Sequence, residues 1–316
     1  MKVLIAGGCG FIGSHAVRHF VESGDDVCVV DALTYAGRRS YLDGLVDDND
    51  FIQADICDKP AMNLLLRCWN PDVVVNFAAE THVDNSIRDC TPFVKTNFEG
   101  ASNLMTACRG IGALYVHLST DEVYGVPDQA ATRGFEPGDP LNPRNPYSAS
   151  KAAADMMLRA NKNTHGQEFL ALRPSNNFGP NQHDEKFLPK LIRCLVSQPD
   201  GDKTDFPLYG DGMQVREWTF APDTAKVVRL AIECGWRDFL NVSSGVSMTN
   251  REVIERVKAI LESEGKLANP DAVQYVMDRQ GHDRRYWIES KLNPSLFTPF
   301  DEALRLTVEH YFQKFA

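Results

Sequence analysis

The stretch "IAGGCGFIGSH", residues 5–15, decides the fold of this chain. It places Gly7, Gly10 and Gly13 between a short apolar run, "VLIA" (3–6), and a segment with helical periodicity. In a strand–turn–helix unit of this kind the backbone can approach a pyrophosphate, and the helix N-terminus supplies N–H donors and a favourable dipole. A glycine pattern alone also fits a plain strand–turn–helix link, so the surrounding sequence has to decide.

The context favours a dinucleotide. Asp31 ends the next apolar run, "VCVV" (27–30), where a carboxylate can bind the ribose hydroxyls of the adenosine. A carboxylate there repels a 2′-phosphate, so we expect NAD; Arg38 and Arg39 nearby keep NADP as an alternative. Asp55 follows the third run (51–54) and is expected near the adenine.

Short apolar runs alternate with helical patterns over the first 174 residues. The runs cover residues 3–6, 27–30, 51–54, 72–79, 113–118 and 169–174. They predict an α/β fold, a Rossmann-type doubly wound parallel sheet with its ligand crevice at the carboxyl ends of the strands. We expect an NAD-binding domain over 1–174, rejoined by 215–245. A smaller mixed α/β nucleotide-sugar-binding domain is expected over 175–316, with helices near 186–197, 222–234, 249–264 and 300–315.

The composition excludes several functions. The chain has 316 residues, 43% of them hydrophobic, and a formal net charge of −10, which argues against binding to nucleic acid or an anionic membrane. No apolar stretch approaches the roughly 18 residues of a membrane span. The eight cysteines form no CxxC pair, which predicts reduced, buried thiols in a cytoplasmic protein. The histidines show no metal-binding spacing, so no metal is expected.

Two motifs carry candidate chemistry. In "NPYSASK", Tyr147 and Lys151 lie four residues apart in a predicted helix, about 6 Å along its axis. A neighbouring ammonium and a positive nicotinamide ring would favour the phenolate of Tyr147. In "STDEVYG" (119–125), Asp121 and Glu122 directly follow a predicted buried strand. Either both acids lie in solvent, or burial pushes their pKa values apart.

Together with "NFAAETHVDNS" and "RPSNNFGP", these motifs resemble the extended short-chain dehydrogenase/reductase family that acts on nucleotide sugars, over nearly the whole chain. The consecutive Asp-Glu is most similar to the dTDP-glucose 4,6-dehydratases of that family. The resemblance implies oxidation of the hexose at C4 by NAD, elimination of water across C5 and C6, and return of the hydride to C6. The product is a 4-keto-6-deoxy sugar.

The resemblance also implies residue roles. Tyr147, assisted by Lys151, takes the 4-hydroxyl proton, Glu122 removes the C5 proton, Asp121 protonates the departing 6-hydroxyl, and Thr120 bonds the 4-hydroxyl. Besides Tyr147 and Lys151, the expected cofactor-binding residues are Gly7, Gly10, Phe11, Ile12, Gly13, Asp31, Asp55, Ile56, Ala78 and Asn176. The expected substrate-binding residues are His82, Asn177, Lys186, Arg216, Asn241, Arg279 and His282.

Members of the family commonly pair two helices across a two-fold axis, which implies a homodimer. The corresponding helices, near 93–109 and 147–162, carry apolar residues on more than one face, among them Met105, Met156, Met157 and Leu158. Two other functions stay open: a nucleotide-sugar 4-epimerase or decarboxylase, and a non-catalytic NAD-binding protein. The sequence also leaves open the sugar and whether the nucleotide is dTDP or UDP.

Overall fold

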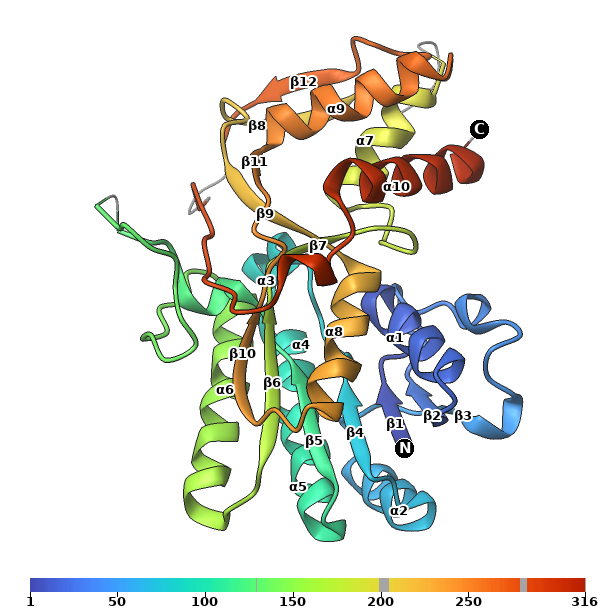
Figure 1. Ribbon diagram of the computed structural model, residues 1–316, viewed down its shortest axis with the longest axis vertical. Coiled ribbons are helices and arrows are strands. Elements are labelled where there is room, and N and C mark those ends of the chain that lie inside the picture. Colours follow the sequence, from blue (N-terminus) through green and yellow to red (C-terminus); the bar gives the residue numbers. More distant parts are fainter. Residues whose placement is uncertain (129, 199–204, 279–282, 316) are drawn as a thin grey trace.

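A seven-stranded parallel sheet forms the centre of the larger lobe (Figure 1). The computed structural model describes residues 1–128, 130–198, 205–278 and 283–315. From one edge to the other, the strands are β10 (Asp238–Val242), β6 (Phe169–Pro174), β5 (Leu114–Leu118), β4 (Val73–Asn76), β1 (Lys2–Ala6), β2 (Asp26–Asp31) and β3 (Phe51–Gln53). The strand order reverses between β1 and β4, so the predicted doubly wound sheet is confirmed.

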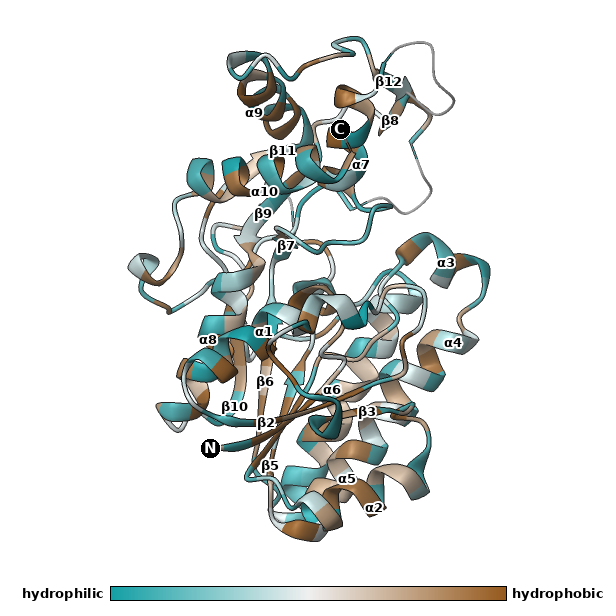
Figure 2. Cartoon of the chain, turned by 90° about the vertical axis from the view of Figure 1, so that its right-hand side faces the viewer, coloured by the Kyte–Doolittle hydropathy of each residue, from teal (hydrophilic) through white to brown (hydrophobic). Residues whose placement is uncertain are grey.

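Alternate residues of the strands face two separate apolar cores. Val3 and Ile5 of β1 pack in one core with helices α1 (Phe11–Glu22) and α8 (Ala221–Glu233). Leu4 and Ala6 pack in the other, against α2 (Lys59–Trp69), α5 (Ala101–Ile111) and α6 (Pro146–His165). Because both faces are covered, the strands are hydrophobic almost throughout (Figure 2).

Short helices connect these elements. They are η1 (Arg39–Leu42), η2 (Asp48–Asp50), α3 (Val83–Arg88), α4 (Thr91–Phe93), the π-helix η3 (Val94–Gly100), the 3₁₀ helix η4 (Asp121–Tyr124) and η5 (Pro294–Leu296). The helix predicted near 93–109 is therefore a continuous run of α4, η3 and α5.

The smaller lobe lies over the carboxyl ends of the large sheet (Figure 1). It contains a three-stranded sheet, β11 (Ser247–Thr249), β9 (Val215–Phe220) and β7 (Asn176–Phe178), and the parallel pair β8 (Phe206–Tyr209) and β12 (Val273–Val276). Helices α7 (Phe187–Val196), α9 (Asn250–Ser263) and α10 (Phe300–Phe315) share a third apolar core. Within 215–245, β9 pairs in this lobe, whereas α8 packs against α1 and β10 pairs with β6. The domain boundary at residue 174 stays a prediction.

The expectation that the cysteines are buried is only partly correct. All eight are unpaired, but Cys68, Cys90 and Cys234 are exposed. In the described part of the chain, no helix is long and apolar enough to cross a bilayer.

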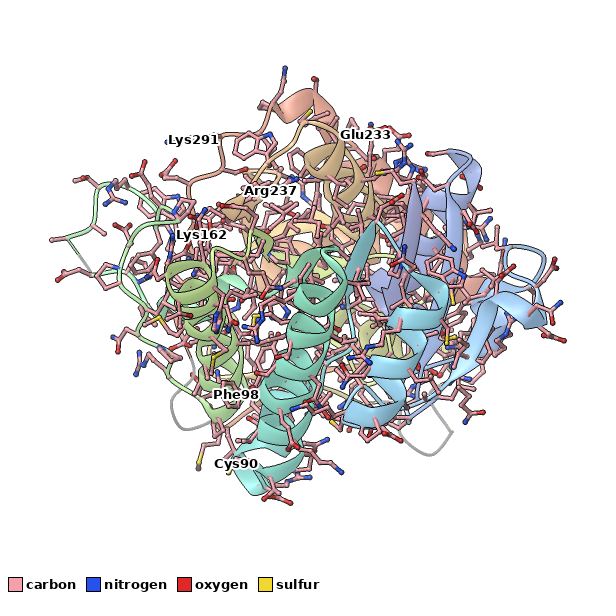
Figure 3. All side chains as sticks on the ribbon, turned by 90° about the horizontal axis from the view of Figure 1, so that it is seen from below. Cys90, Phe98, Lys162, Glu233, Arg237 and Lys291 are labelled. Atoms are coloured by element: carbon pink, nitrogen blue, oxygen red, sulfur yellow. The ribbon has the colours of Figure 1, made fainter. Side chains whose placement is uncertain are left out.

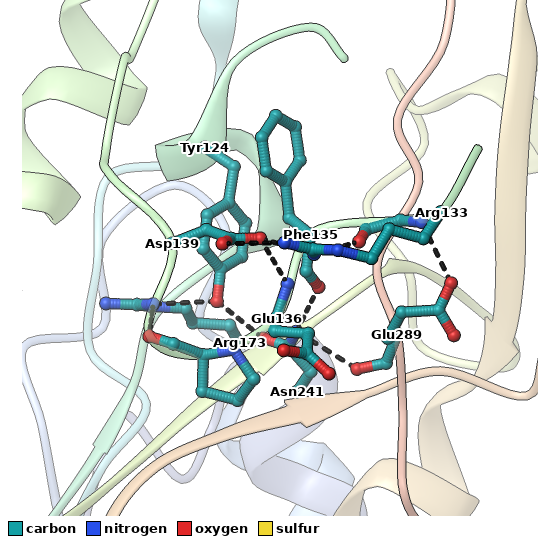
Figure 4. A network of polar contacts seen from close by, with 10 residues as sticks. Tyr124, Arg133, Phe135, Glu136, Asp139, Arg173, Asn241 and Glu289 are labelled. Carbon is teal, nitrogen blue, oxygen red and sulfur yellow. Dashed lines mark hydrogen bonds and ion pairs between the residues drawn. The ribbon is translucent and has the colours of Figure 1, made fainter. Parts of the chain in front are cut away.

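A buried ion pair fixes the end of β6 to helix α6. The side chains of Arg173 and Asp155 are 2% and 0% exposed, and Arg173 Nε donates to Asp155 Oδ2 at 2.8 Å. One terminal nitrogen of Arg173 also donates to the hydroxyl of Tyr124 at 2.7 Å, and that hydroxyl donates to Asn241 Oδ1 at 2.8 Å (Figure 4). The network joins α6, η4, β6 and β10 directly behind the crevice.

Asp155→Ala should lower the free energy of unfolding by about 3–5 kcal/mol, because it leaves the Arg173 guanidinium charged and buried without its partner. Chemical denaturation measures this change. The control is Glu168→Ala, which removes a 51% exposed carboxylate that pairs with Lys162 at 3.1 Å. It should cost less than about 1 kcal/mol. Equal effects of the two substitutions would contradict the stabilising role of the ion pair between Arg173 and Asp155.

Candidate active site

The glycine-rich turn is packed too tightly for any side chain at two of its positions. Gly7 has φ +75°, and its N–H donates to the carbonyl of Val30 at 2.8 Å. A Cβ on Gly7 would lie 2.4 Å from the backbone nitrogen of Ala78, and one on Gly13 would lie 2.1 Å from the carbonyl oxygen of Gly7. Helix α1 begins immediately afterwards, at Phe11. The backbone of the turn thus lies beside the N-terminus of α1 with no side chain at Gly7 or Gly13, an arrangement that fits a pyrophosphate.

Asp31 lies beside this turn at the end of β2. It is 8% exposed, and its two carboxylate oxygens accept hydrogen bonds from the backbone N–H groups of Cys9 at 2.9 Å and Leu33 at 2.8 Å. Burial raises its pKa, whereas these two hydrogen bonds lower it. A cavity of about 110 Å³ adjoins the carboxylate. Six residues expected at the cofactor line it: Gly7, Gly10, Asp31, Asp55, Ile56 and Ala78.

A second cavity of about 350 Å³ lies next to the first and shares Gly7 and Gly10 with it. Residues expected to be catalytic or to bind ligands meet on its lining, and they come from η4, α6, β7 and the loop before α7. The expected residues on it are Phe11, Ile12, Gly13, Thr120, Asp121, Glu122, Tyr147, Lys151, Asn176, Asn177 and Lys186.

The two adjacent acids are not a solvated turn. Thr120 caps η4: its Oγ1 accepts from the N–H of Glu122 and donates to Asp121 Oδ1, both at 3.3 Å. Asp121 is 3% exposed, and its Oδ2 has no hydrogen-bond partner among the described residues. Glu122 Oε2 accepts from Asn145 Nδ2 at 3.2 Å and lies 3.5 Å from the hydroxyl of Tyr286.

These surroundings affect the pKa values of the two acids differently. Burial raises the pKa of Asp121 well above its ordinary value, and the charges of Glu122 and Glu217 raise it further. Burial also raises the pKa of Glu122, but the hydrogen bond from Asn145 and the charge of Arg216 oppose that rise. The arrangement favours a protonated Asp121 beside an ionised Glu122.

Tyr147 and Lys151 lie one turn apart on α6, and both are buried. Lys151 Nζ donates to the carbonyl of Leu118 at 2.7 Å, and burial lowers its pKa to about 8. The pKa of Tyr147 is raised, first by burial and then by the charge of Glu122. These effects oppose the phenolate in the protein alone, and the expected assistance from Lys151 and the nicotinamide ring stays a prediction.

A third cavity, of about 480 Å³, lies between α3 and the smaller lobe. It is lined by His82 and Lys186, by the cations Lys190 and Arg193, and by Phe206 and Tyr209 among others. Arg216 is not among the described residues lining the three cavities. It is 8% exposed, donates to the carbonyl of Asp283 at 2.9 Å and lies over the ring of Tyr286.

Asn241 is not among the described residues that line the three cavities, and its role in substrate binding stays a prediction. It is 1% exposed on β10, and its amide is used within the protein. Its Oδ1 accepts from Tyr124, and its Nδ2 donates to the carbonyls of Phe135 at 2.8 Å and Glu289 at 3.1 Å (Figure 4). Arg279 and His282 lie outside the described residues.

Three residues near the acids were not predicted. Asn145 precedes Pro146, a pattern typical of a helix N-terminus, but nothing in it indicates contact with Glu122. Tyr286 and Glu217 stand in the motifs "DRQGHDRRY" and "LYGDGMQVREW". Glu217 is 3% exposed and accepts from the N–H of Ile288 at 3.2 Å, and burial raises its pKa to about 7.

Comparison with known proteins agrees with this site. The sequence profile of the family described as GDP-mannose 4,6 dehydratase matches residues 4–304. The chain belongs to that family. The dehydratase resemblance expected from the motifs is thereby confirmed.

Relatives in this 4,6-dehydratase family match the chain over nearly its full length. The low-salt glycan biosynthesis protein Agl12 of Haloferax volcanii is 41% identical, over 98% of each chain. The dTDP-glucose 4,6-dehydratase of Xanthomonas campestris pv. campestris is 38% identical, over 98% of this chain and 92% of its own. The crystal structure of DesIV, a dTDP-glucose 4,6-dehydratase from Streptomyces venezuelae with NAD bound, superposes with a TM-score of 0.88. It is 37% identical and covers 99% of this chain and 97% of its own.

Gly13→Ala should weaken NAD binding about tenfold or more, because its Cβ would displace the Gly7 carbonyl and open the turn. Titration calorimetry with NAD measures the affinity. The control is Gly110→Ala in the exposed part of α5, where a Cβ meets no described atom within 4 Å. This control should leave the affinity unchanged; a similar loss in both variants, or none in Gly13→Ala, would contradict the role of the turn.

Proposed function

We propose that this protein is an NAD-dependent nucleotide-hexose 4,6-dehydratase, with dTDP-glucose as its first-choice substrate. One observation carries the proposal: Asp121 and Glu122 line the same cavity as Tyr147 and Lys151, and their surroundings favour opposite protonation states. Oxidation at C4 alone needs only the tyrosine and lysine. Elimination of water needs in addition one group that takes a proton and one that gives a proton.

The residues on these two neighbouring cavities fit NAD. The turn at Gly7 and Gly13 leaves no space for side chains, and Asp31 presents an amide-held carboxylate that suits ribose hydroxyls and disfavours a 2′-phosphate. DesIV, a relative of the same family, is crystallised with NAD. NAD, when bound, accepts a hydride from C4 of the hexose and returns it to C6.

Each catalytic residue moves one proton. Tyr147 takes the proton of the 4-hydroxyl, to which Thr120 is proposed to hydrogen-bond. Once C4 is a ketone, the C5 proton is acidic, and Glu122 takes it; when the hydride returns to C6, Glu122 gives the proton back to C5. Asp121 gives its proton to the 6-hydroxyl, which leaves as water as the C6–O bond breaks. General acid and base groups of this kind typically contribute about 10²–10⁴-fold each.

The third cavity suits the nucleoside diphosphate. It brings Lys186, Lys190 and Arg193 together with the aromatic rings of Phe206 and Tyr209 in a protein whose net charge is −10. Such a local group of cations can meet the negative charges of a diphosphate. The relatives named as dTDP-glucose 4,6-dehydratases support dTDP as the nucleotide. A cytoplasmic location stays a prediction.

We further propose a homodimer formed through α3, η3 and α6. These elements contact one another, and they expose Ile87 (56%), Val94 (49%) and Met156 (62%). Figure 3 shows α5 and α6 side by side at the underside of the larger lobe. Of the apolar residues named on more than one face of these helices, Met105 and Leu158 are 3% and 2% exposed and belong to the core between the sheet and the helices.

Incubation of the purified protein with dTDP-glucose, and separately with UDP-glucose, should produce a sugar nucleotide lighter by one water. Mass spectrometry without added reductant detects the loss, and the relative rates rank the two nucleotides. An unchanged mass with inverted stereochemistry at C4 would instead indicate a 4-epimerase. Bound NAD without any conversion of either compound would contradict the proposed reaction.

Asp121→Asn should slow the loss of water at least about 10²-fold, because an amide cannot give its proton to the leaving hydroxyl. A 4-epimerase would tolerate this substitution. The control is Asp128→Asn, at an exposed carboxylate in the following loop that accepts from the N–H of Ala130 at 2.9 Å. It should retain the rate of the unmodified protein.

Met156→Lys should convert the protein from a dimer to a monomer, because it places a charge in the proposed apolar contact. Light scattering should give about twice the chain mass of 35.3 kDa for the unmodified protein and one chain mass for the variant. Met277→Lys, at a 92% exposed methionine of the smaller lobe, should remain dimeric. A monomeric unmodified protein at micromolar concentration would contradict the dimer.

A further inference from the structure

We infer that Asn145 is a positioning residue that makes Glu122, rather than Asp121, the base of the elimination. The same side chain fixes the start of the helix that carries Tyr147 and Lys151. The inference rests on the proposed function, because it concerns which of the two acids takes the C5 proton.

The orientation of the Asn145 amide follows from its place at the N-terminus of α6. Asn145 is the N-cap, and its Oδ1 accepts from the N–H of Ser148 at 2.8 Å. Since the oxygen must face this N–H, the amide nitrogen must face the other way. It donates to Glu122 Oε2 at 3.2 Å. The capping hydrogen bond to Ser148 therefore turns the NH₂ group of the Asn145 amide toward Glu122.

The adjacent acid receives a hydroxyl donor instead of an amide, and the charges of Glu122 and Glu217 act against its ionisation. Asp121 Oδ1 accepts only from its neighbour Thr120, at 3.3 Å, and Oδ2 has no partner in the described part of the chain. A hydrogen bond donated to a carboxylate stabilises its charged form, and a buried carboxyl without one favours the neutral form. The Asn145 amide thus adds to the difference between two chemically similar neighbouring side chains, in the direction that favours an ionised Glu122.

The contact between Asn145 and Glu122 also connects the residues proposed for the oxidation with those proposed for the elimination. Tyr147 follows Asn145 by two residues, and Lys151 follows by six, on the helix that the Asn145 cap begins. Glu122 lies 23 residues before Asn145, in the turn after β5. The helix that holds the oxidation residues and the turn that holds the elimination residues are therefore joined at Asn145, directly beside the cavity.

Other charged or titratable groups also surround Glu122 and would stay in place when Asn145 is changed. Tyr286, 3.5 Å from Glu122 Oε2, has a shorter contact of 2.6 Å to Asp283, so its single proton is already engaged there. The groups that act on Glu122 or respond to its charge are Asp121 on η4, Tyr147 on α6, Lys186 before α7, Arg216 on β9, and Asp283 and Tyr286 in the segment after residue 282.

Two substitutions separate the donor from the cap. Aspartate and serine cap helices about as well as asparagine, so Asn145→Asp and Asn145→Ser should leave the thermal unfolding temperature nearly unchanged. Both remove the amide nitrogen that donates to Glu122: serine leaves only a shorter hydroxyl, and aspartate adds a like charge. The control is Asn293→Asp, which changes another asparagine N-cap, one that accepts from the N–H of Ser295 at 3.0 Å.

The readout is the deuterium isotope effect on kcat with substrate labelled at C4 or at C5. In Asn145→Ser, kcat should fall about tenfold, the C5 effect should rise, and the C4 effect should not rise, because only proton removal at C5 has become slower. The acidic limb of the kcat–pH profile should move up by about one unit, since loss of the donor raises the pKa of Glu122. Asn145→Asp should show larger changes in the same directions, and Asn293→Asp should show none.

An infrared titration of the Glu122 carboxylate, identified by difference from Glu122→Gln, tests the inference without turnover. The pKa of Glu122 should be higher in Asn145→Ser than in the unmodified protein. Equal slowing at C4 and C5 with an unmoved pH limb, or an unchanged infrared pKa, would overturn the inference. Absence of water loss in the unmodified protein with a shifted infrared pKa would instead overturn the proposed function and leave the Asn145 contact established.

Discussion

The parallel direction of the seven strands is the constraint on which the rest of this structure depends. It brings the carboxyl ends of β2, β4, β5 and β6 to one edge of the sheet. Along the chain, the residues at these ends are spread over positions 31 to 176. Asp31, the turn that carries Asp121 and Glu122, and Asn176 all follow directly from those ends. The smaller lobe covers this edge, which excludes water from the acids and gives their surroundings control of their charge.

At this edge of the sheet, the properties of the site depend on short backbone distances and on single hydrogen bonds. A side chain at Gly13 would occupy the position of the Gly7 carbonyl, so a cofactor turn exists only with glycine there. Asp121 and Glu122 have the same functional group, and they differ in burial and in the donors that reach them. The fold thus places neighbouring carboxyl groups in surroundings that shift their pKa values differently.

Much of the fold was predictable because local patterns carry it. The six apolar runs became six strands, with ends shifted by up to three residues, and Gly7, Asp31, Tyr147 and Lys151 lie where their motifs indicated. The sequence says least about residues whose surroundings come from distant segments. Asn241 is bound by residues 124, 135 and 289, none of them near it in sequence. Of the apolar residues on the several faces of these helices, Met105 and Leu158 pack in the core, whereas Met156 is exposed.

The sequence by itself determined the sheet, the dinucleotide turn and the identity of the reactive side chains, because glycine spacing, apolar periodicity and the Asp-Glu pair are properties of contiguous residues. Only the tertiary structure decided the electrostatic state of those side chains. Asn145 meets Glu122 across 23 residues, and Tyr286 meets it across 164. Burial raises the pKa of Tyr147 despite a lysine one turn away. Desolvation and hydrogen bonding depend on which distant groups come within a few ångströms, and chain folding alone sets those distances.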